Sequence, residues 1–437
     1  MPPFPSRHRK RRYRVEYRPS RPAYWDEAAL AEDMRRAFDI CNGCRLCYNL
    51  CPSFPELFRF VEGHEDDARR LTQAELDRVA DLCYQCKLCF VKCPYTPPHQ
   101  FDLDFPRLML RSKAVRARKA GLSRADRFLG SPERTGQIGT SLPGLTNWAT
   151  RSPALRAVME RVLGVDRRRR LPRYARVRFS RWARSRGAVA DPDVVVFSTC
   201  TVEYNEPGLG RDAIKVLEHQ GLRVAVPEGQ QCCGMPALDG GDVNGAVARA
   251  RANVAVLAEH ARAGKPIVAL QPTCAYVLKT EYPMLLDGDE AAAAVAAKTV
   301  DVTDFLAEMA RTNQLKTDFT RPLGAVTYHV SCHTRALGGG GRGRDLLARI
   351  PGTRVMMVEQ CAGIDGTWGL KAQWYDASQK VAAKLTRTFR DRHDTEPCSD
   401  CKLAGLQIAE AAGRPPAHPV ELLARAYGFL PDNEGTG

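Results

Sequence analysis

CNGCRLCYNLCP, at residues 41–52, places four cysteines and a closing proline in a fixed order, and CYQCKLCFVKCP repeats that order at residues 83–94. In each copy two residues separate the first three cysteines from one another, and three residues precede the fourth. Thiolates spaced this closely can surround one metal centre as the chain turns. Structural zinc rarely uses three cysteines at two-residue gaps, so two full copies favour iron–sulfur clusters over zinc.

This spacing is that of bacterial two-cluster ferredoxins, in which the fourth cysteine of each motif ligates the other cluster. It therefore predicts two [4Fe–4S] clusters. The expected ligands are Cys41, Cys44, Cys47 and Cys93 for the first cluster, and Cys83, Cys86, Cys89 and Cys51 for the second.

Helices are expected to lead into both motifs. Asp26 is a candidate N-cap for a helix that runs into Cys41. Thr72, followed by Glu75, predicts the capping box of a second helix, which ends near Cys83. With this extra helix the region is longer than a minimal ferredoxin, and it resembles the helical ferredoxin domain of succinate dehydrogenase iron–sulfur subunits.

The chain repeats itself after about residue 190. Strands are expected at 194–197 and 326–330, and each leads through a helix to a second strand, at 223–226 and 354–358. The repeat indicates duplication of one β–α–β unit. Cysteines follow the predicted strands at their carboxyl ends, where open α/β sheets form their sites.

Cys200, followed at a distance by Cys232-Cys233-Gly234, resembles the CCG domain of the heterodisulfide reductase family. In that family a leading cysteine, an adjacent pair and a closing Cys-x-x-Cys bind a noncubane [4Fe–4S] cluster. A helical ferredoxin domain followed by two CCG domains resembles a narrower family. It includes the iron–sulfur subunit of anaerobic glycerol-3-phosphate dehydrogenase and the glycolate and lactate oxidase iron–sulfur subunits. The run CAGIDGTWG at 361–369 favours the first of these.

Each half departs from the five-cysteine pattern at one position. Gln271 stands where the first half needs a cysteine, and Ala362 stands where the second half needs the second cysteine of its pair. Four cysteines remain in each half, which is enough for an ordinary cubane, and the resemblance implies one further iron–sulfur cluster per CCG domain. Zinc and a purely structural role are the alternatives. The candidate ligands are Cys200, Cys232, Cys233 and Cys274 in the first half, and Cys332, Cys361, Cys398 and Cys401 in the second.

Together these features predict a multi-domain protein, with an α-helical ferredoxin domain plus a duplicated α/β CCG domain. The expected order is a basic disordered arm at 1–22, the helical ferredoxin domain at 23–106, a basic connector at 107–189, the first CCG domain at 190–320 and the second at 321–437.

The net charge of +15 is concentrated before residue 188. Lys and Arg gather in residues 1–22, 107–127 and 151–187. Such segments suit contact with acidic lipid, an acidic partner or nucleic acid, and the competing interpretation is a solvated arm and linker.

Three aromatic residues, Tyr174, Phe179 and Trp182, interleave with arginines in the last basic segment. They suit a membrane surface, nucleic acid or a partner subunit. No apolar run approaches the roughly 18 residues of a spanning helix, and no export signal follows the basic start. We therefore expect a cytoplasmic protein, with peripheral membrane contact as an option. In that compartment dense cysteine indicates metal rather than disulfides.

Two weaker signals have structural as well as functional explanations. GGGGRG at 338–343, with Glu359 beyond it, matches a dinucleotide-binding fingerprint, but it does not follow a strand directly, so a glycine loop is the favoured interpretation. His329 and His333 flank Cys332. They are candidates for proton delivery or for hydrogen bonds to a metal site, and packing at a strand end is the favoured alternative.

No flavin-binding fingerprint, nucleophile elbow or P-loop stands out, so the substrate chemistry is expected on another subunit. The resemblance implies an electron-transfer subunit of a multi-subunit oxidoreductase, relaying electrons between a flavoprotein dehydrogenase and a quinone or other redox acceptor. One alternative is a disulfide reductase acting at a CCG-domain cluster, which the missing fifth cysteines disfavour. A nucleic-acid-binding protein with structural clusters is a further, weaker alternative.

Overall fold

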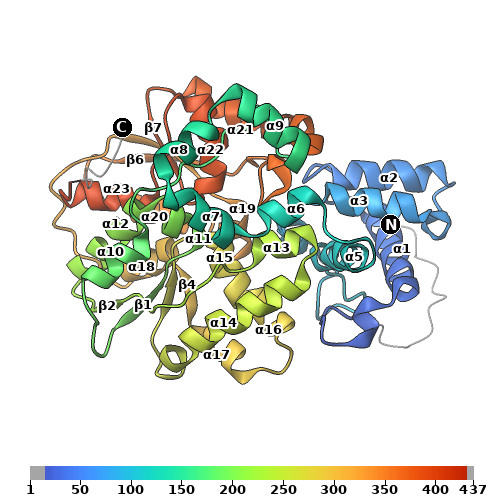
Figure 1. Cartoon of the computed structure of the whole chain (residues 1–437), viewed down its shortest axis with the longest axis horizontal. Coiled ribbons are helices and arrows are strands. Elements are labelled where there is room, and N and C mark those ends of the chain that lie inside the picture. The colour runs from blue at the N-terminus through green and yellow to red at the C-terminus, as the bar shows by residue number, and fades with distance from the viewer. Residues whose placement is uncertain (1–14, 431–437) are drawn as a thin grey trace. The chain divides into compact units, whose positions relative to one another are not determined.

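The computed structural model describes residues 15–430, and contacts divide the chain into two compact units (Figure 1). The described part of the first unit comprises residues 15–83 and 87–115, and that of the second comprises residues 84–86 and 116–430. Residues 1–14 of the predicted basic arm lie outside the described residues. The rest of that arm is not a free tail, because the Val15 side chain is buried in the core of the first unit.

The first unit is helical. Asp26 caps its first helix by accepting a hydrogen bond from the Ala29 backbone at 3.0 Å, and Thr72 and Glu75 form the expected capping box. The helices are α1 (Glu27–Cys44), α2 (Ser53–Gly63), α3 (Gln73–Leu82), α4 (Leu88–Lys92) and α5 (Phe105–Ala120), with short turns η1 (Pro22–Trp25) and η2 (Ala68–Arg70).

Helix α5 joins the first unit as far as residue 115, although composition predicts that the connector begins at 107. Its Leu108 and Met109 side chains are buried in the same core as those of α1 to α3. Arg111 forms a buried ion pair with Asp33 at 2.7 Å and donates to the Tyr24 carbonyl at 2.7 Å. A buried arginine with these partners fixes α5 against α1 and η1.

Residues 116–189 are part of the second unit rather than a separate linker. Phe179 is fully buried in its main core, and Glu133 pairs with Arg249 of a later helix at 2.8 Å. The segment folds into α6 (Arg124–Leu129), α7 (Pro132–Ser141), α8 (Pro143–Ala149), α9 (Pro153–Leu163) and α10 (Phe179–Ser185).

The first half of the predicted repeat forms a parallel sheet in the order β2-β1-β3-β4. Its strands are β1 (Val194–Phe197), β2 (Val224–Ala225), β3 (Ile267–Ala269) and β4 (Thr299–Asp301). Its helices are α11 (Cys200–Tyr204), α12 (Pro207–His219), α13 (Met235–Gly240), α14 (Val243–Arg262), α15 (Pro272–Tyr276), the π-helix η3 (Val277–Glu281), α16 (Tyr282–Leu285), α17 (Glu290–Lys298) and α18 (Val302–Arg311).

The second half forms a parallel sheet in the order β6-β5-β7, which is the order of the first three strands of the first half. Its strands are β5 (Ala325–His329), β6 (Arg354–Val358) and β7 (Glu396–Ser399). Its helices are α19 (Cys332–Ala336), α20 (Arg342–Leu347), η4 (Trp368–Leu370), η5 (Ala372–Trp374), α21 (Tyr375–Asp391), α22 (Lys402–Ala412) and α23 (Pro419–Ala426).

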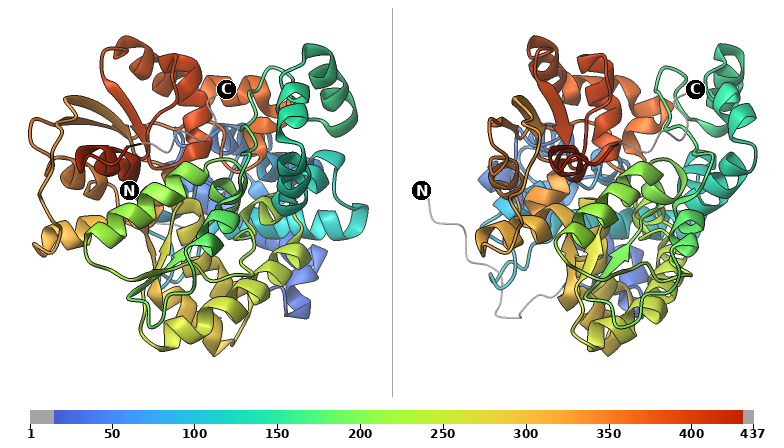
Figure 2. Two further views of the ribbon diagram at one scale, coloured as in Figure 1. Left: turned by 60° about the vertical axis from the view of Figure 1, so that its left-hand side comes forward. Right: turned by 90° about the vertical axis from the view of Figure 1, so that its left-hand side faces the viewer.

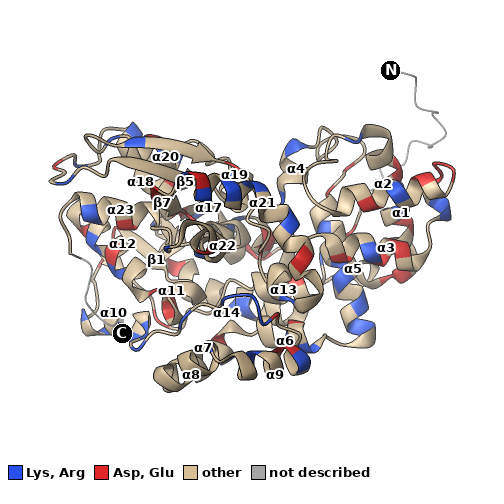
Figure 3. Cartoon of the chain, turned by 90° about the horizontal axis from the view of Figure 1, so that it is seen from above, with Lys and Arg blue, Asp and Glu red and all other residues tan. Residues whose placement is uncertain are grey.

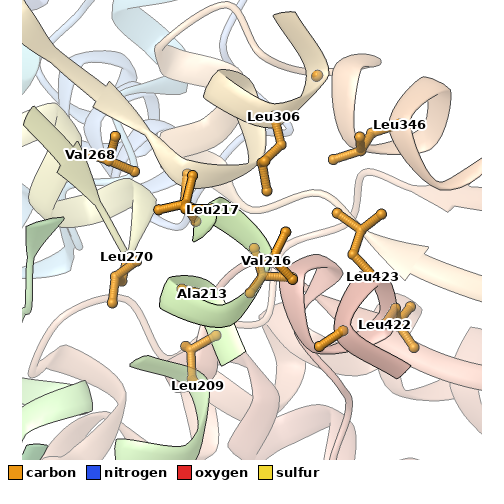
Figure 4. Close-up of a cluster of buried hydrophobic side chains, with 14 of the residues drawn as sticks. Leu209, Ala213, Val216, Leu217, Val268, Leu270, Leu306, Leu346, Leu422 and Leu423 are labelled. Atoms are coloured by element: carbon orange, nitrogen blue, oxygen red, sulfur yellow. The ribbon is translucent and has the colours of Figure 1, made fainter. Parts of the chain in front are cut away.

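The two halves share one hydrophobic core. Figure 2 shows them side by side, the first in green and yellow and the second in orange and red. Leu217 of α12 and Leu306 of α18 lie in the same buried cluster as Leu346 of α20 and Leu423 of α23 (Figure 4). The halves expected to be separate domains therefore bury their apolar faces against each other. None of the helices between residues 15 and 430 is long and apolar enough to cross a membrane.

Candidate metal centres

The first unit carries the four cysteines expected at the first cluster, and three of them act on Cys41 as neighbouring charges. Cys41 and Cys44 lie in the last turn of α1, and Cys93 caps the end of α4. Burial raises the pKa of Cys41 well above its usual value, and Cys47, Cys93 and Cys44 raise it further as neighbouring thiolates. These four are the ligands that the spacing predicts for the first cluster.

Three cysteines expected at the second cluster lie around the core of the same unit. Cys83 caps the end of α3, and both Cys83 and Cys89 of α4 are buried in the hydrophobic core of the unit. Cys51 packs against that core. Cys86 is the fourth expected ligand, and it belongs with Tyr84 and Gln85 to the second unit. There its sulfur forms a hydrogen bond with the Cys332 thiol. Hydrogen bonding with Cys361, and next with Cys86, raises the pKa of Cys332 well above its usual value.

In the first half of the repeat, all four candidate ligands follow the carboxyl ends of parallel strands. Cys200 opens α11 after β1, Cys232 and Cys233 lie between β2 and α13, and Cys274 lies in α15 after β3. Because these strand ends meet at one edge of the sheet, the sulfur atoms form a continuous chain of contacts, Cys200–Cys232–Cys233–Cys274.

The electrostatics of this group favour a thiolate at its centre. Hydrogen bonds from the thiols of Cys200 and Cys233 lower the pKa of Cys232 well below its usual value. The same contacts with Cys232 raise the pKa values of Cys200 and Cys233. Thiolate is the metal-binding form, and four sulfurs linked by pairwise contacts, three of them on buried cysteines, suit an iron–sulfur cluster.

Two polar residues outside the cysteine motifs hold the Cys232 loop. Glu133 of α7 accepts from the Cys232 backbone at 3.0 Å. Burial raises the pKa of Glu133, but the hydrogen bond and charge of Arg249 outweigh it and lower the pKa overall. Asn253 of α14 donates to the Cys232 carbonyl at 3.1 Å. No sequence pattern points to these residues, because both are distant along the chain.

A cavity of about 230 Å³ lies beside Cys200 and Cys232. Glu133, Glu203 and Arg184 line it together with polar backbone. It gives the first cysteine group an opening on one side.

The second half brings fewer of its cysteines together. Cys332 opens α19 after β5, and Cys361 lies in the loop after β6. Their sulfur atoms and a carboxylate oxygen of Asp365 all lie within 4.8 Å of one another. A hydrogen bond from Cys332 lowers the pKa of Cys361 to about 7. The Gly363 backbone also donates to the Cys361 sulfur at 3.3 Å, and the Tyr84 hydroxyl, of the same unit, lies 3.6 Å from that sulfur.

Cys398 and Cys401 take different positions at the end of β7. Cys398 is fully buried in the shared hydrophobic core, and burial, followed by the charge of Asp400, raises its pKa well above the usual value. Cys401 lies beyond the strand, where burial raises its pKa to about 12 and the charges of Asp400 and Asp365 contribute. Cys398 therefore lies in the core, whereas the Cys401 sulfur accepts a hydrogen bond from the Ala404 backbone at 3.5 Å.

Asp400 organises the polar end of this sheet. Its fully buried carboxylate accepts from the Tyr328 hydroxyl at 2.9 Å, the Thr334 hydroxyl at 2.8 Å and the Ser331 backbone at 3.1 Å. His329 is also buried and hydrogen-bonds to Ser399 at 3.0 Å. Burial lowers the pKa of His329 to about 4, so it remains neutral, which fits packing at a strand end rather than proton delivery.

The helices that carry the two cysteine groups pack on each other. His333 of α19 hydrogen-bonds to Thr273 of α15 at 3.0 Å, and its ring lies 5.2 Å from that of Tyr276. Gln271, which replaces a cysteine of the CCG pattern, accepts from the Lys402 backbone at 3.2 Å. The two groups therefore lie on neighbouring edges of the two sheets.

The glycine loop at 338–343 has a structural role. A Cβ at Gly339 would meet an Asp304 carboxylate oxygen at 2.6 Å, and Gly340 faces Glu359. Two carboxylates so close disfavour a bound phosphate, and the loop instead lets the chain pass near them.

The aromatic residues of the last basic segment face the protein interior. Phe179 is fully buried, Trp182 packs against the same core, and the Tyr174 ring lies against Gly139. Their predicted role as a membrane or nucleic-acid surface is therefore not supported by their placement.

Comparison with known proteins gives matches to both regions. Residues 34–121 match the family described as the citrate utilization protein B Fer4-like domain, and residues 194–279 and 326–404 each match the CCG cysteine-rich domain. The C subunit of anaerobic glycerol-3-phosphate dehydrogenase from Escherichia coli K12 is 33% identical over 297 residues, which cover 67% of this chain and 74% of that protein. Lactate utilization protein A of Bacillus licheniformis is 31% identical over 216 residues, covering 48% and 87% respectively.

The cysteine groups and these matches define the class, an iron–sulfur protein with an N-terminal Fer4-like domain and two CCG domains. Within this class, the chain belongs to the family of the C subunit of anaerobic glycerol-3-phosphate dehydrogenase.

Proposed function

We propose that the chain is an electron-transfer subunit of a multi-subunit oxidoreductase, relaying electrons between a flavoprotein dehydrogenase and a quinone or other redox acceptor. The observation that carries this proposal is the packing of α15 on α19, which places the Cys274 and Cys332 groups on adjoining helices. Electron transfer between two centres falls steeply with distance, so adjoining sites favour a relay.

The proposed cofactors are two [4Fe–4S] clusters on the ferredoxin cysteines and one further iron–sulfur cluster in each CCG domain. Such clusters supply one-electron oxidation and reduction. The residues of the chain hold them, exclude water and set their potentials. Backbone donors such as Gly363, at 3.3 Å from the Cys361 sulfur, would stabilise the more negative, reduced state.

A redox partner for the relay is supported by the Escherichia coli relative, which is a subunit of a dehydrogenase. The family membership makes a flavoprotein the first candidate donor. A disulfide reductase remains the rival. It requires turnover by this chain alone, whereas a relay subunit requires a partner.

The proposed location is cytoplasmic, with peripheral contact at the membrane through α7 to α9. This surface, called here the apolar helix surface, has exposed side chains of Ile138, Leu142, Leu145, Trp148, Leu155, Val158 and Val162. Helix α8 carries no charged residue (Figure 3). Large exposed apolar side chains near arginines such as Arg151 suit the interface of an anionic bilayer.

The experiment is anaerobic purification with measurement of iron, acid-labile sulfide and EPR spectra, on the wild type and on Cys274→Ala. A four-cluster relay predicts about sixteen irons per chain, with about four lost in the variant. Reduced dye should supply electrons to the clusters, with no reduction of added disulfide by the chain alone. About eight irons, unchanged in the variant, would restrict the relay to the ferredoxin pair, and disulfide turnover without a partner would favour the rival function.

A further inference from the structure

The second cysteine group has a gap in its thiol ligands. Ala362 carries no thiol where the CCG pattern has the second cysteine of its pair, and Cys398 is fully buried in the hydrophobic core. Cys332 and Cys361 lie together, and Cys401 packs against the neighbouring buried cluster that includes Ala362. Cys86, whose sulfur contacts Cys332, is expected to ligate the second ferredoxin cluster. A cubane needs a protein ligand at each of its four irons to be fully held, so one more donor is required.

The Asp365 carboxylate lies where that donor is needed. One of its oxygens is within 4.8 Å of the sulfur atoms of both Cys332 and Cys361, close enough for all three atoms to reach one metal ion. Asp365 therefore adjoins two of the candidate thiols.

The loop around Asp365 is held in place by its neighbours. Asp365 adopts a φ of +26°, a conformation that aspartate tolerates better than most residues. On one side Gly363 (φ +68°) fits against the Ser378 carbonyl, which an added Cβ would meet at 2.3 Å. On the other side the Thr367 hydroxyl donates to buried Asp239 at 2.9 Å. A loop fixed at both ends positions the carboxylate before any cluster binds.

We infer that Asp365, together with Cys332, Cys361 and Cys401, completes the ligand set of the second CCG site in place of the thiol that Ala362 lacks. This inference rests on the proposed function, because it presumes a cluster in that domain. A carboxylate is a harder ligand than a thiolate and holds iron less firmly in an otherwise sulfur-rich site. The iron bound by Asp365 is therefore the one that this cluster loses first on oxidation.

The test uses the full chain, loaded anaerobically, with iron analysis and EPR after mild oxidation as readouts. The wild type should lose about one iron per chain and develop the signal of a three-iron cluster, since the carboxylate-held corner is labile. Asp365→Cys should keep that iron under the same oxidant. Asp365→Ala should lack it from the start, and Asp391→Ala, an exposed aspartate at the end of α21, should behave as the wild type.

Cys361→Ala and Cys398→Ala separate the possible failures. If Asp365→Ala keeps the wild-type spectrum and Cys398→Ala loses it, Cys398 is the fourth ligand and the inference is overturned. If Cys361→Ala has the same iron content and EPR spectrum as the wild type, the second CCG domain holds no cluster. The CCG-domain part of the proposed function then fails, and the inference fails with it. If Asp365→Cys keeps all its iron and does not develop the three-iron signal that the oxidised wild type shows, this variant supports the inference even if Asp365→Ala folds poorly.

Discussion

His418 provides a prediction at the scale of one residue. It caps α23 by accepting a hydrogen bond from the Val420 backbone at 3.2 Å, which requires an unprotonated ring nitrogen. Burial lowers its pKa to about 3. The pKa of this imidazole in the unfolded chain is about 6.5. As the pH falls below that value, the unfolded state binds a proton that the folded state does not, so the folded protein loses stability. Between pH 7.5 and 5.5 this residue alone should cost about 1.4 kcal/mol of unfolding free energy.

His418→Asn should reduce that pH dependence. Asparagine can cap the same helix but does not titrate, so the variant should lose less stability than the wild type over this pH range. Urea unfolding of the loaded chain at both pH values, followed by circular dichroism, measures the difference. His393→Asn, at an exposed position, is the matched control. An unchanged pH dependence of the unfolding free energy in His418→Asn would contradict the role of His418 as its source.

The sequence predicts those structural features that depend on residues close together along the chain. The capping box at Thr72 and the strands near 194–197 and 354–358 follow from local spacing. Glu133 cannot be predicted in this way, because it reaches the Cys232 backbone from α7, across 99 positions of the chain. The burial of Cys398 also depends on the packing of the second half against the first, which no spacing of cysteines encodes.

At the scale of elements, the apolar helix surface should bind membranes. Burying a large apolar side chain contributes about 1.5–3 kcal/mol, so replacing both Leu145 and Trp148 by glutamate should weaken binding to anionic vesicles by at least about tenfold. Co-sedimentation with phosphatidylglycerol vesicles measures this. Leu430→Glu changes an equally exposed side chain elsewhere and should bind as the wild type. Equal sedimentation of the double variant and the wild type would assign the surface to another partner.

The helices between residues 116 and 189 show why an arginine-rich composition wrongly suggests a solvent-exposed linker. Residues 151–187 are rich in arginine, which suggests a solvated linker, yet Arg156 and Arg169 are buried. Arg169 donates to the Gly369 carbonyl at 3.1 Å and to the Ser378 hydroxyl at 2.7 Å. Charge counts do not distinguish arginines that face solvent from those that bind backbone carbonyls inside the fold.

At the scale of the whole molecule, the shared core makes the two CCG halves depend on each other. A chain ended at residue 320 would expose Leu217 and Leu306, whose buried cluster includes Leu346 and Leu423 of the missing half. Each fully buried leucine contributes about 1.5–3 kcal/mol, and domains are stable by only about 5–15 kcal/mol, so losing several such contacts should prevent folding of the first half. We expect the truncated chain to aggregate or to show rapid hydrogen exchange in β1 and β3, while α1 to α3 keep their protection. A soluble monomer of residues 1–320 with wild-type protection in β1 and a cluster lost on Cys274→Ala would instead make each half an independent domain.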